Sequence, residues 1–255
     1  MAAEEVRIVF YFFYSRSAGG PMAARDIVEK ALSEGRNFLL EPEAKKLVSS
    51  YGIPVTKIAV AKSEDEAVEL ARQIGFPVVL KIVSPDVLHK SDVGGVIVNL
   101  KSEEEVREAY RRILDNVKAR VPNARIAGIL VQEYAPQGTE VIIGLIRDPQ
   151  FGPTVMFGLG GVFVEVFEDV SFRVAPLTEL DAEEMVREIK GYKILTGYRG
   201  AEPADLEAIK SALITVGNIG MEIEEISEMD LNPVMAYPDG IKVVDARIIL
   251  RGAQS

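Results

Sequence analysis

The chain has 255 residues, and its 29 basic and 39 acidic residues give a formal net charge of −10. This length allows one large domain or two small ones, and the acidic balance excludes the positive surface field that nucleic-acid and anionic-membrane binding require. The lack of cysteine excludes disulfides and thiolate metal sites, and the single histidine excludes a multi-histidine zinc site.

The N-terminal region shows no pattern of a membrane anchor or a secretion signal. No apolar run reaches the roughly 18 residues that span a bilayer. The apolar stretch over residues 6–14 consists of strand-forming residues and lacks an Ala-x-Ala cleavage site. We therefore expect a cytoplasmic protein. A helical pattern begins at Met22, so we interpret residues 1–21 as an N-terminal extension.

Hydrophobic periodicity and capping patterns divide the remaining chain into helices and short strands. Ser63 and Ser102 each stand three residues before a glutamate, the capping-box spacing that begins a helix. The predicted helices cover residues 22–35, 41–51, 64–74, 103–120, 180–190 and 203–219. The predicted strands cover residues 55–61, 77–83, 96–100, a run ending at 134, 140–146, 153–157, 162–166, 172–175, 222–230 and 241–245.

This order of elements predicts an α+β fold of two lobes that meet near residues 132–138. A nucleotide or a small substrate is expected in the cleft between two such lobes. We expect a helical leading segment over residues 22–56 to pack on the second lobe. The first lobe should then cover residues 57–133 and the second lobe residues 134–255.

Lys81 and a glycine pair are the first candidates for phosphate binding. Lys81 lies in an otherwise apolar strand, where alternation places it on one face with Val79 and Val83. A buried ammonium group requires an anion, so Lys81 is either a phosphate contact or an edge-strand lysine whose tip reaches solvent. The Gly94-Gly95 loop either brings backbone amides close to phosphate or forms an ordinary turn.

Polar oxygens gather near the C-terminus, where two strands are predicted to be neighbours. Asp230 and Asn232 alternate onto one face of a strand, and Asp245 can meet them from the next strand. Mg²⁺ prefers such hard oxygen ligands and takes few of them from protein. The alternative interpretation is turn chemistry, because Asn-Pro and Asp-Gly pairs commonly mark turns.

His89 is the only histidine and stands in a loop between Lys81 and the glycine pair. A solitary histidine in a loop is often an ordinary surface residue. A neutral imidazole is, however, a competent nucleophile toward phosphorus at neutral pH. Both interpretations follow from the sequence.

Four long stretches resemble a known family. They are LLEPEAKKLVSSYGIPV, GFPVVLKIVSPDVLHKSDVGGVIVNL, VQEYAPQGTEVIIGLIRDPQFGPTVMFGLGGVFVEV and EMDLNPVMAYPDGIKVVDARI. Together they are similar to the ATP-grasp subunit of the ADP-forming acetyl-CoA synthetases over about residues 37–250. A more distant resemblance extends to the β subunit of succinyl-CoA synthetase.

The resemblance implies roles for individual residues. In such proteins the strand lysine, here Lys81, contacts the phosphates of ATP or ADP, and the loop histidine, here His89, accepts a phosphoryl group. Asn232 and Asp245 match the family's Mg²⁺ ligands, and Asp230 beside them is a further catalytic candidate. The stretch formed by Gln132, Glu133, Tyr134 and Ala135 is implied to hold the adenine, Glu140 to contact the ribose or the base, and Arg173 to contact phosphate. Gly94 and Gly95 complete the candidate nucleotide contacts.

The family reaction converts acyl-CoA, ADP and phosphate into acid, CoA and ATP. The chain has no second histidine, so the resemblance implies that a separate CoA-binding α subunit carries the other phosphohistidine of the family, in an α₂β₂ complex. Two rival hypotheses remain at this point. One is a self-contained ATP-grasp carboxylate ligase without a phosphohistidine, and the other is a nucleotide-sensing domain without turnover.

Overall fold

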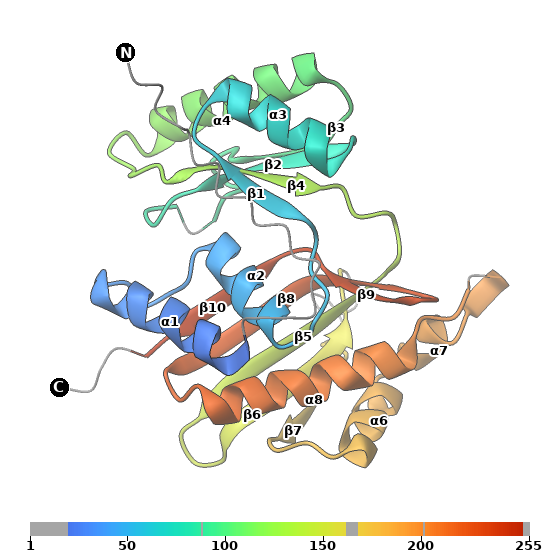
Figure 1. Cartoon of the computed structure of the whole chain (residues 1–255). Helices are drawn as coiled ribbons and strands as arrows, with labels where there is room; N and C mark the ends of the chain where they lie inside the picture. The colour runs from blue at the N-terminus through green and yellow to red at the C-terminus, as the bar shows by residue number, and fades with distance from the viewer. Residues whose placement is uncertain (1–19, 88, 162–167, 201, 252–255) are drawn as a thin grey trace. The chain divides into compact units, whose positions relative to one another are not determined.

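The computed structural model describes residues 20–87, 89–161, 168–200 and 202–251 (Figure 1). These residues form two compact units. The first unit covers residues 57–134, and the second unit combines residues 20–56 with residues 135–251. Tyr134 therefore belongs to the first unit, one residue beyond the boundary expected from the sequence. None of the described helices is long and apolar enough to cross a bilayer.

The first unit is a four-stranded antiparallel sheet with two helices on one face. The strand order is β1-β4-β2-β3. Its core gathers apolar side chains from one face of the sheet and from both helices. The elements are β1 (Ile58–Ala61), α3 (Glu64–Ile74), β2 (Val78–Val83), β3 (Val96–Leu100), α4 (Glu103–Arg120) and β4 (Gly128–Glu133).

Both helices of the first unit begin at the serines that the sequence marks as caps. The Ser63 hydroxyl accepts a hydrogen bond from the Glu66 amide at 3.2 Å, and the Ser102 hydroxyl accepts one from the Glu105 amide at the same distance. Each serine thereby satisfies one of the amides that the first helical turn leaves without a partner. The predicted bounds of α3 are confirmed residue for residue.

The second unit is built on a larger antiparallel sheet with the strand order β10-β8-β5-β6-β7, to which β9 adds beside β8. Helices α1 and α2 come from the N-terminal segment, whereas α6, α7 and α8 come from the second half of the chain. The elements are α1 (Gly20–Ser33), α2 (Glu41–Ser50), β5 (Thr139–Asp148), β6 (Gly152–Leu159), β7 (Val170–Val174), α6 (Glu179–Glu188), α7 (Tyr192–Leu195), α8 (Leu206–Glu222), β8 (Ile226–Tyr237), β9 (Gly240–Val243) and β10 (Ala246–Leu250).

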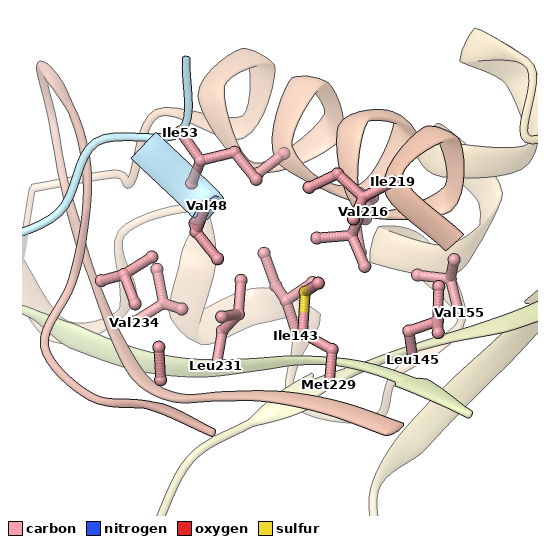
Figure 2. Packing of buried hydrophobic residues seen from close by; sticks show 14 of the residues in the cluster. Val48, Ile53, Ile143, Leu145, Val155, Val216, Ile219, Met229, Leu231 and Val234 are labelled. Carbon is pink, nitrogen blue, oxygen red and sulfur yellow. The ribbon is translucent and has the colours of Figure 1, made fainter. Parts of the chain in front are cut away.

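The core of the second unit lies between the sheet and its helices. Figure 2 shows Val48 of α2 and Val216 of α8 directed toward the same face of the sheet, which carries Ile143 and Leu231. These four side chains are fully buried. Each contributes roughly 1.5–3 kcal/mol relative to an exposed position. This packing fixes one face of β5 and β8 and leaves their other face outside this core.

Several elements of the structure differ from the expected ones, and three differences concern which strands form. The run expected as one strand over residues 55–61 is divided, because Val55 pairs with Val243 in the second unit and β1 begins at Ile58. Helix α8 extends to Glu222, so β8 begins only at Ile226. Strand β10 was not predicted. The strand expected over residues 162–166 lies outside the described residues.

Candidate functional site

Lys81 lies in the interior of the first unit's sheet, because β2 pairs with β3 on one side and with β4 on the other. The edge-strand interpretation is therefore wrong. Lys81 is only 5% exposed and shares its face with Val79 and Val83, as the alternation predicts. The Gln132 side chain lies on the same face, because Val79 pairs directly with it. Lys81 and Gln132 are thus diagonal neighbours that can contact one ligand.

The glycine pair has a role in its own loop. The Gly94 amide donates to the Ser91 carbonyl at 3.0 Å, and the Gly95 amide donates to the Lys90 carbonyl at 2.7 Å. A Cβ atom on Gly95 would lie 2.6 Å from an Ile82 methyl group, so only glycine fits there. Because both amides are already used, the expected amide contact of Gly94 and Gly95 with phosphate is not supported.

His89 is exposed in the loop that connects β2 to β3. The loop is anchored shortly before it at Asp86, whose carboxylate accepts hydrogen bonds from the Arg125 amide at 2.7 Å and from the Arg125 guanidinium at 2.7 and 3.0 Å. These hydrogen bonds lower the pKa of Asp86 to about 2. The anchor therefore stays charged at neutral pH while the imidazole faces solvent three residues later.

The end of β4 contains the stretch expected to hold the adenine. Gln132 is 1% exposed, and Tyr134 is exposed. The Glu133 amide donates to the Lys57 carbonyl at 3.0 Å, and the Tyr134 amide donates to the Pro77 carbonyl at 3.2 Å. These two amides are therefore not the groups that recognise an adenine. Ala135 is the first residue of the second unit after this stretch.

Asn232 and Asp245 lie next to each other in the second unit. The backbone amide of Asn232 donates to the backbone carbonyl of Asp245 at 3.2 Å, and the backbone amide of the neighbouring Val244 donates to the carbonyl of Pro233 at 2.9 Å. Asn232 is exposed and Asp245 is half-buried. The side-chain amide oxygen of Asn232 and the carboxylate of Asp245 fit the preference of Mg²⁺ for hard oxygen ligands. This ion keeps several waters and needs few protein ligands. Among the described residues, no cluster of three or more His, Cys, Asp or Glu side chains could hold a metal.

Asp230 adds negative charge to the same face of β8. Burial is the main cause that raises the pKa of its carboxyl group, and the charge of Glu228 raises the pKa further. Arg247, directly opposite on β10, lowers this pKa, while Asp245 raises it. The carboxylates repel one another, so a cation would stabilise this face of the sheet.

Glu140 lies on this same face. The strand β5 pairs regularly with β6, so Glu140 points to the same side as Gly144, which pairs with Asp230. Its carbonyl accepts a hydrogen bond from the Gly160 amide at 2.8 Å. A Cβ atom on Gly160 would lie 2.9 Å from the Glu140 Cβ. The backbone at Gly160 therefore comes very close to Glu140, whose side chain is exposed.

The structure contradicts the expected phosphate contact of Arg173. This residue pairs with Val155, which faces the helix-covered core, so it lies on the sheet face opposite to Asp230. Its guanidinium donates to Glu188 at 3.0 Å and to Glu184 at 3.3 Å, both on α6. The hydrogen bond with Glu188 is the first cause that raises the pKa of Arg173. Arg173 ties β7 to α6.

Comparisons with known proteins identify the family to which the chain belongs. A family model described as an ATP-grasp domain matches residues 30–250. The β subunit of acetate–CoA ligase [ADP-forming] I from Pyrococcus furiosus is 54% identical over 227 residues, which cover 89% of this chain and 97% of that one. The chain belongs to the ATP-grasp family, among the β subunits of ADP-forming acetate–CoA ligases.

Other relatives of this ATP-grasp chain are single longer proteins. Acetate–CoA ligase [ADP-forming] I from Archaeoglobus fulgidus is 50% identical over 89% of this chain, which spans 33% of that protein. The solved acetyl-coenzyme A synthetase 1 from Ca. Korarchaeum cryptofilum, in complex with coenzyme A and Ca-AMPCP, has 73% identity and a TM-score of 0.88, covering 89% of this chain and 100% of that one.

A second structure of the Korarchaeum protein contains a phosphorylated phosphohistidine segment. It is 71% identical to this chain, with a TM-score of 0.84 and coverage of 89% of this chain and 100% of that one. The expected family and the α+β ATP-grasp fold are confirmed.

Proposed function

We propose that this chain is the nucleotide-binding β subunit of an ADP-forming acetyl-CoA synthetase and passes phosphate through His89 to ADP. The observation that carries the proposal is the position of the only histidine. It is exposed in the loop that follows the buried strand lysine, in a chain that aligns with 97% of a β subunit of this enzyme class. We place this reaction in the cytoplasm, where ADP and CoA thioesters are produced.

The transfer requires one covalent intermediate. An imidazole nitrogen of His89 attacks a phosphoryl donor on the partner, so that an N–P bond forms as the donor's bond to phosphorus breaks. A terminal oxygen of ADP then attacks the same phosphorus. The new P–O bond makes ATP while the N–P bond breaks and the imidazole returns neutral.

The remaining residues bind and orient the nucleotide in this proposal. Lys81 and Gln132 contact the phosphates from the first unit, and the backbone near Ala135 recognises the base. Glu140 contacts the nucleoside from the second unit. Asn232 and Asp245 would hold Mg²⁺, with Asp230 nearby, and the bound ion would neutralise charge on the phosphates. Gly94, Gly95 and Arg173 take no part.

A CoA-binding α subunit completes the enzyme, and we propose an α₂β₂ complex. The test mixes purified β chain with a separately expressed α subunit and measures ATP formation from acetyl-CoA, ADP and phosphate. We expect turnover only in the mixture and a complex mass equal to two copies of each subunit. Turnover by the β chain alone, or a mixture that binds ADP and forms no ATP, would contradict the proposal.

Replacing Lys81 by methionine tests the phosphate contact. Lys81→Met keeps the aliphatic length and removes the charge from a site that is 5% exposed. A hydrogen bond from a charged group contributes about 1.5–3 kcal/mol, so we expect ADP binding to weaken roughly tenfold to a hundredfold. Isothermal titration calorimetry measures this change.

The matched control is Lys101→Met, which removes an exposed lysine of the same unit just outside β3. ADP affinity should not change in this variant. Circular dichroism of both variants checks that the fold is kept. A Lys81→Met protein that binds ADP like the original chain would assign the lysine to structure alone.

A further inference from the structure

Helix α2 buries an ion pair that the proposed function does not use. The Lys45 ammonium lies 3.1 Å from a Glu41 carboxylate oxygen, and the two side chains are 0% and 2% exposed. The same ammonium donates a hydrogen bond to the Thr56 hydroxyl at 2.9 Å. Thr56 is itself 0% exposed. Helix α2 and the segment that leaves the second unit are therefore joined by a buried polar triad, defined as Glu41, Lys45 and Thr56.

Stability alone does not explain this triad. Desolvation offsets most of the attraction within a buried ion pair, and well-packed apolar residues in its place are often neutral or stabilising. The other buried positions of α2 are apolar, namely Ala44, Leu47 and Val48. An apolar residue at position 45 would continue that pattern. What the ammonium adds is a directed hydrogen bond to one hydroxyl.

The hydrogen bond fixes Thr56 beside strand β9. The Thr56 amide donates to the Val243 carbonyl at 3.0 Å, and the Val243 amide donates to the Pro54 carbonyl at 2.9 Å. Val55 forms a parallel bridge with Val243 between these two bonds. Residues 54–56 therefore hold one side of the backbone at position 243.

On its other side, the backbone of residues 243–245 is hydrogen-bonded to the strand that carries the candidate metal ligand Asn232. The Val244 amide donates to Pro233, and the Asp245 carbonyl accepts from Asn232. Residues 243–245 are thus held from one side by the segment that contains Thr56 and from the other by the strand that contains Asn232. We expect a shift of Thr56 to move the backbone of Asp245 relative to that of Asn232.

We propose that Lys45 is a positioning residue for the Mg²⁺ ligands Asn232 and Asp245, acting through Thr56 and Val243. This inference rests on the proposed function, because it takes the Mg²⁺ site from there. Groups that orient metal ligands typically change metal affinity 10–100-fold when they are removed. The triad has this effect on the Mg²⁺ dependence of nucleotide binding and leaves metal-free binding unchanged.

The sharpest test compares two substitutions of one residue. Thr56→Val keeps the shape and removes the hydroxyl, whereas Thr56→Ser keeps the hydroxyl. Calorimetric ADP titrations are run at several Mg²⁺ concentrations and in EDTA. We expect Thr56→Val to need at least about tenfold more Mg²⁺ for half of the metal-dependent gain in affinity, and Thr56→Ser to behave like the original chain. Affinity in EDTA should be equal in all three proteins.

A double variant tests the ion pair without leaving a buried charge alone. Glu41→Leu with Lys45→Met replaces both charges by apolar groups, so we expect a melting temperature close to the original and the Mg²⁺ shift of Thr56→Val. If the double variant does not fold, the Thr56 pair decides the question by itself.

Asp245→Ala separates failure of this inference from failure of the metal site. If Asp245→Ala loses the Mg²⁺ dependence and Thr56→Val keeps it unchanged, the positioning role is wrong and the metal ligand stands. If Asp245→Ala also keeps the dependence, both assignments are wrong. A Thr56→Ser protein as impaired as Thr56→Val would likewise contradict a role for the hydroxyl.

Discussion

Incubated with Mg²⁺ and γ-labelled ATP, the isolated β chain should acquire a label on His89. The reverse of ATP formation needs only the nucleotide site of this subunit, and the imidazole is exposed in its loop. The resulting phosphoramidate should be labile in acid and stable in alkali. Peptide mapping after mild alkaline treatment locates the label. An acid-stable label on Ser84 or Ser91 would instead indicate ordinary hydroxyl phosphorylation.

The variant His89→Asn keeps a polar side chain and removes the nucleophilic nitrogen. We expect synthesis of ATP with the α subunit to fall on the order of a thousandfold or more, the scale seen when a covalent nucleophile is removed. The single histidine of the chain offers no substitute. ADP affinity should stay within about twofold, because the nucleotide contacts are on other residues. Full activity in this variant would leave a conventional ATP-grasp ligase as the better account.

The second large effect is expected at the metal ligands. Asp245→Ala and Asn232→Ala each remove one side-chain oxygen ligand from two residues whose backbones are hydrogen-bonded to each other. A catalytic metal stabilises phosphoryl transfer by several kcal/mol, so we expect the rate of His89 phosphorylation to fall roughly a hundredfold or more. The Mg²⁺ dependence of ADP binding should fall with it. Melting temperatures should change little, because Asn232 is exposed and Asp245 is half-buried.

Asp239→Asn is the matched control for this pair. Asp239 is an exposed carboxylate in the turn between β8 and β9, close in sequence to both ligands and outside β8, the strand that carries Asn232. Its replacement removes one negative charge and should leave the Mg²⁺ dependence unchanged. Unchanged Mg²⁺ dependence in Asp245→Ala and Asn232→Ala would remove the metal assignment.

Local signals in the sequence predicted much of the fold. The helix starts at Ser63 and Ser102 depend on a side chain and an amide three residues apart, so a short window contains all the information. Alternation along residues 78–83 likewise placed Lys81 with Val79. The break near Val55 was missed, because that residue joins a different unit from the strand that follows it, and no local pattern records such a partner.

The sequence predicted the parts of the candidate site that depend on alternation along a strand. It did not predict the parts that depend on which strands pair and which side chains contact each other. Asn232 and Asp245 were expected to be neighbours, and their backbones are. Arg173 was assigned by resemblance, and only the pairing with Val155 shows that it faces the helices. Lys45 was overlooked because two adjacent lysines suggest a solvated surface. Its i, i+4 spacing from Glu41 on the apolar side of α2 was the available signal.

The second unit is discontinuous in the chain, because the first unit is inserted between its two parts. Phe38 pairs with Ile249, more than 200 positions away, whereas every strand of the first unit lies within residues 58–133. Contacts between distant positions are slow to form, and a growing chain folds from its N-terminus. During synthesis the inserted unit can complete its sheet first. The segment with α1 and α2 must wait for β10, so the nascent chain carries an unsatisfied apolar surface until residues 246–250 have been synthesised.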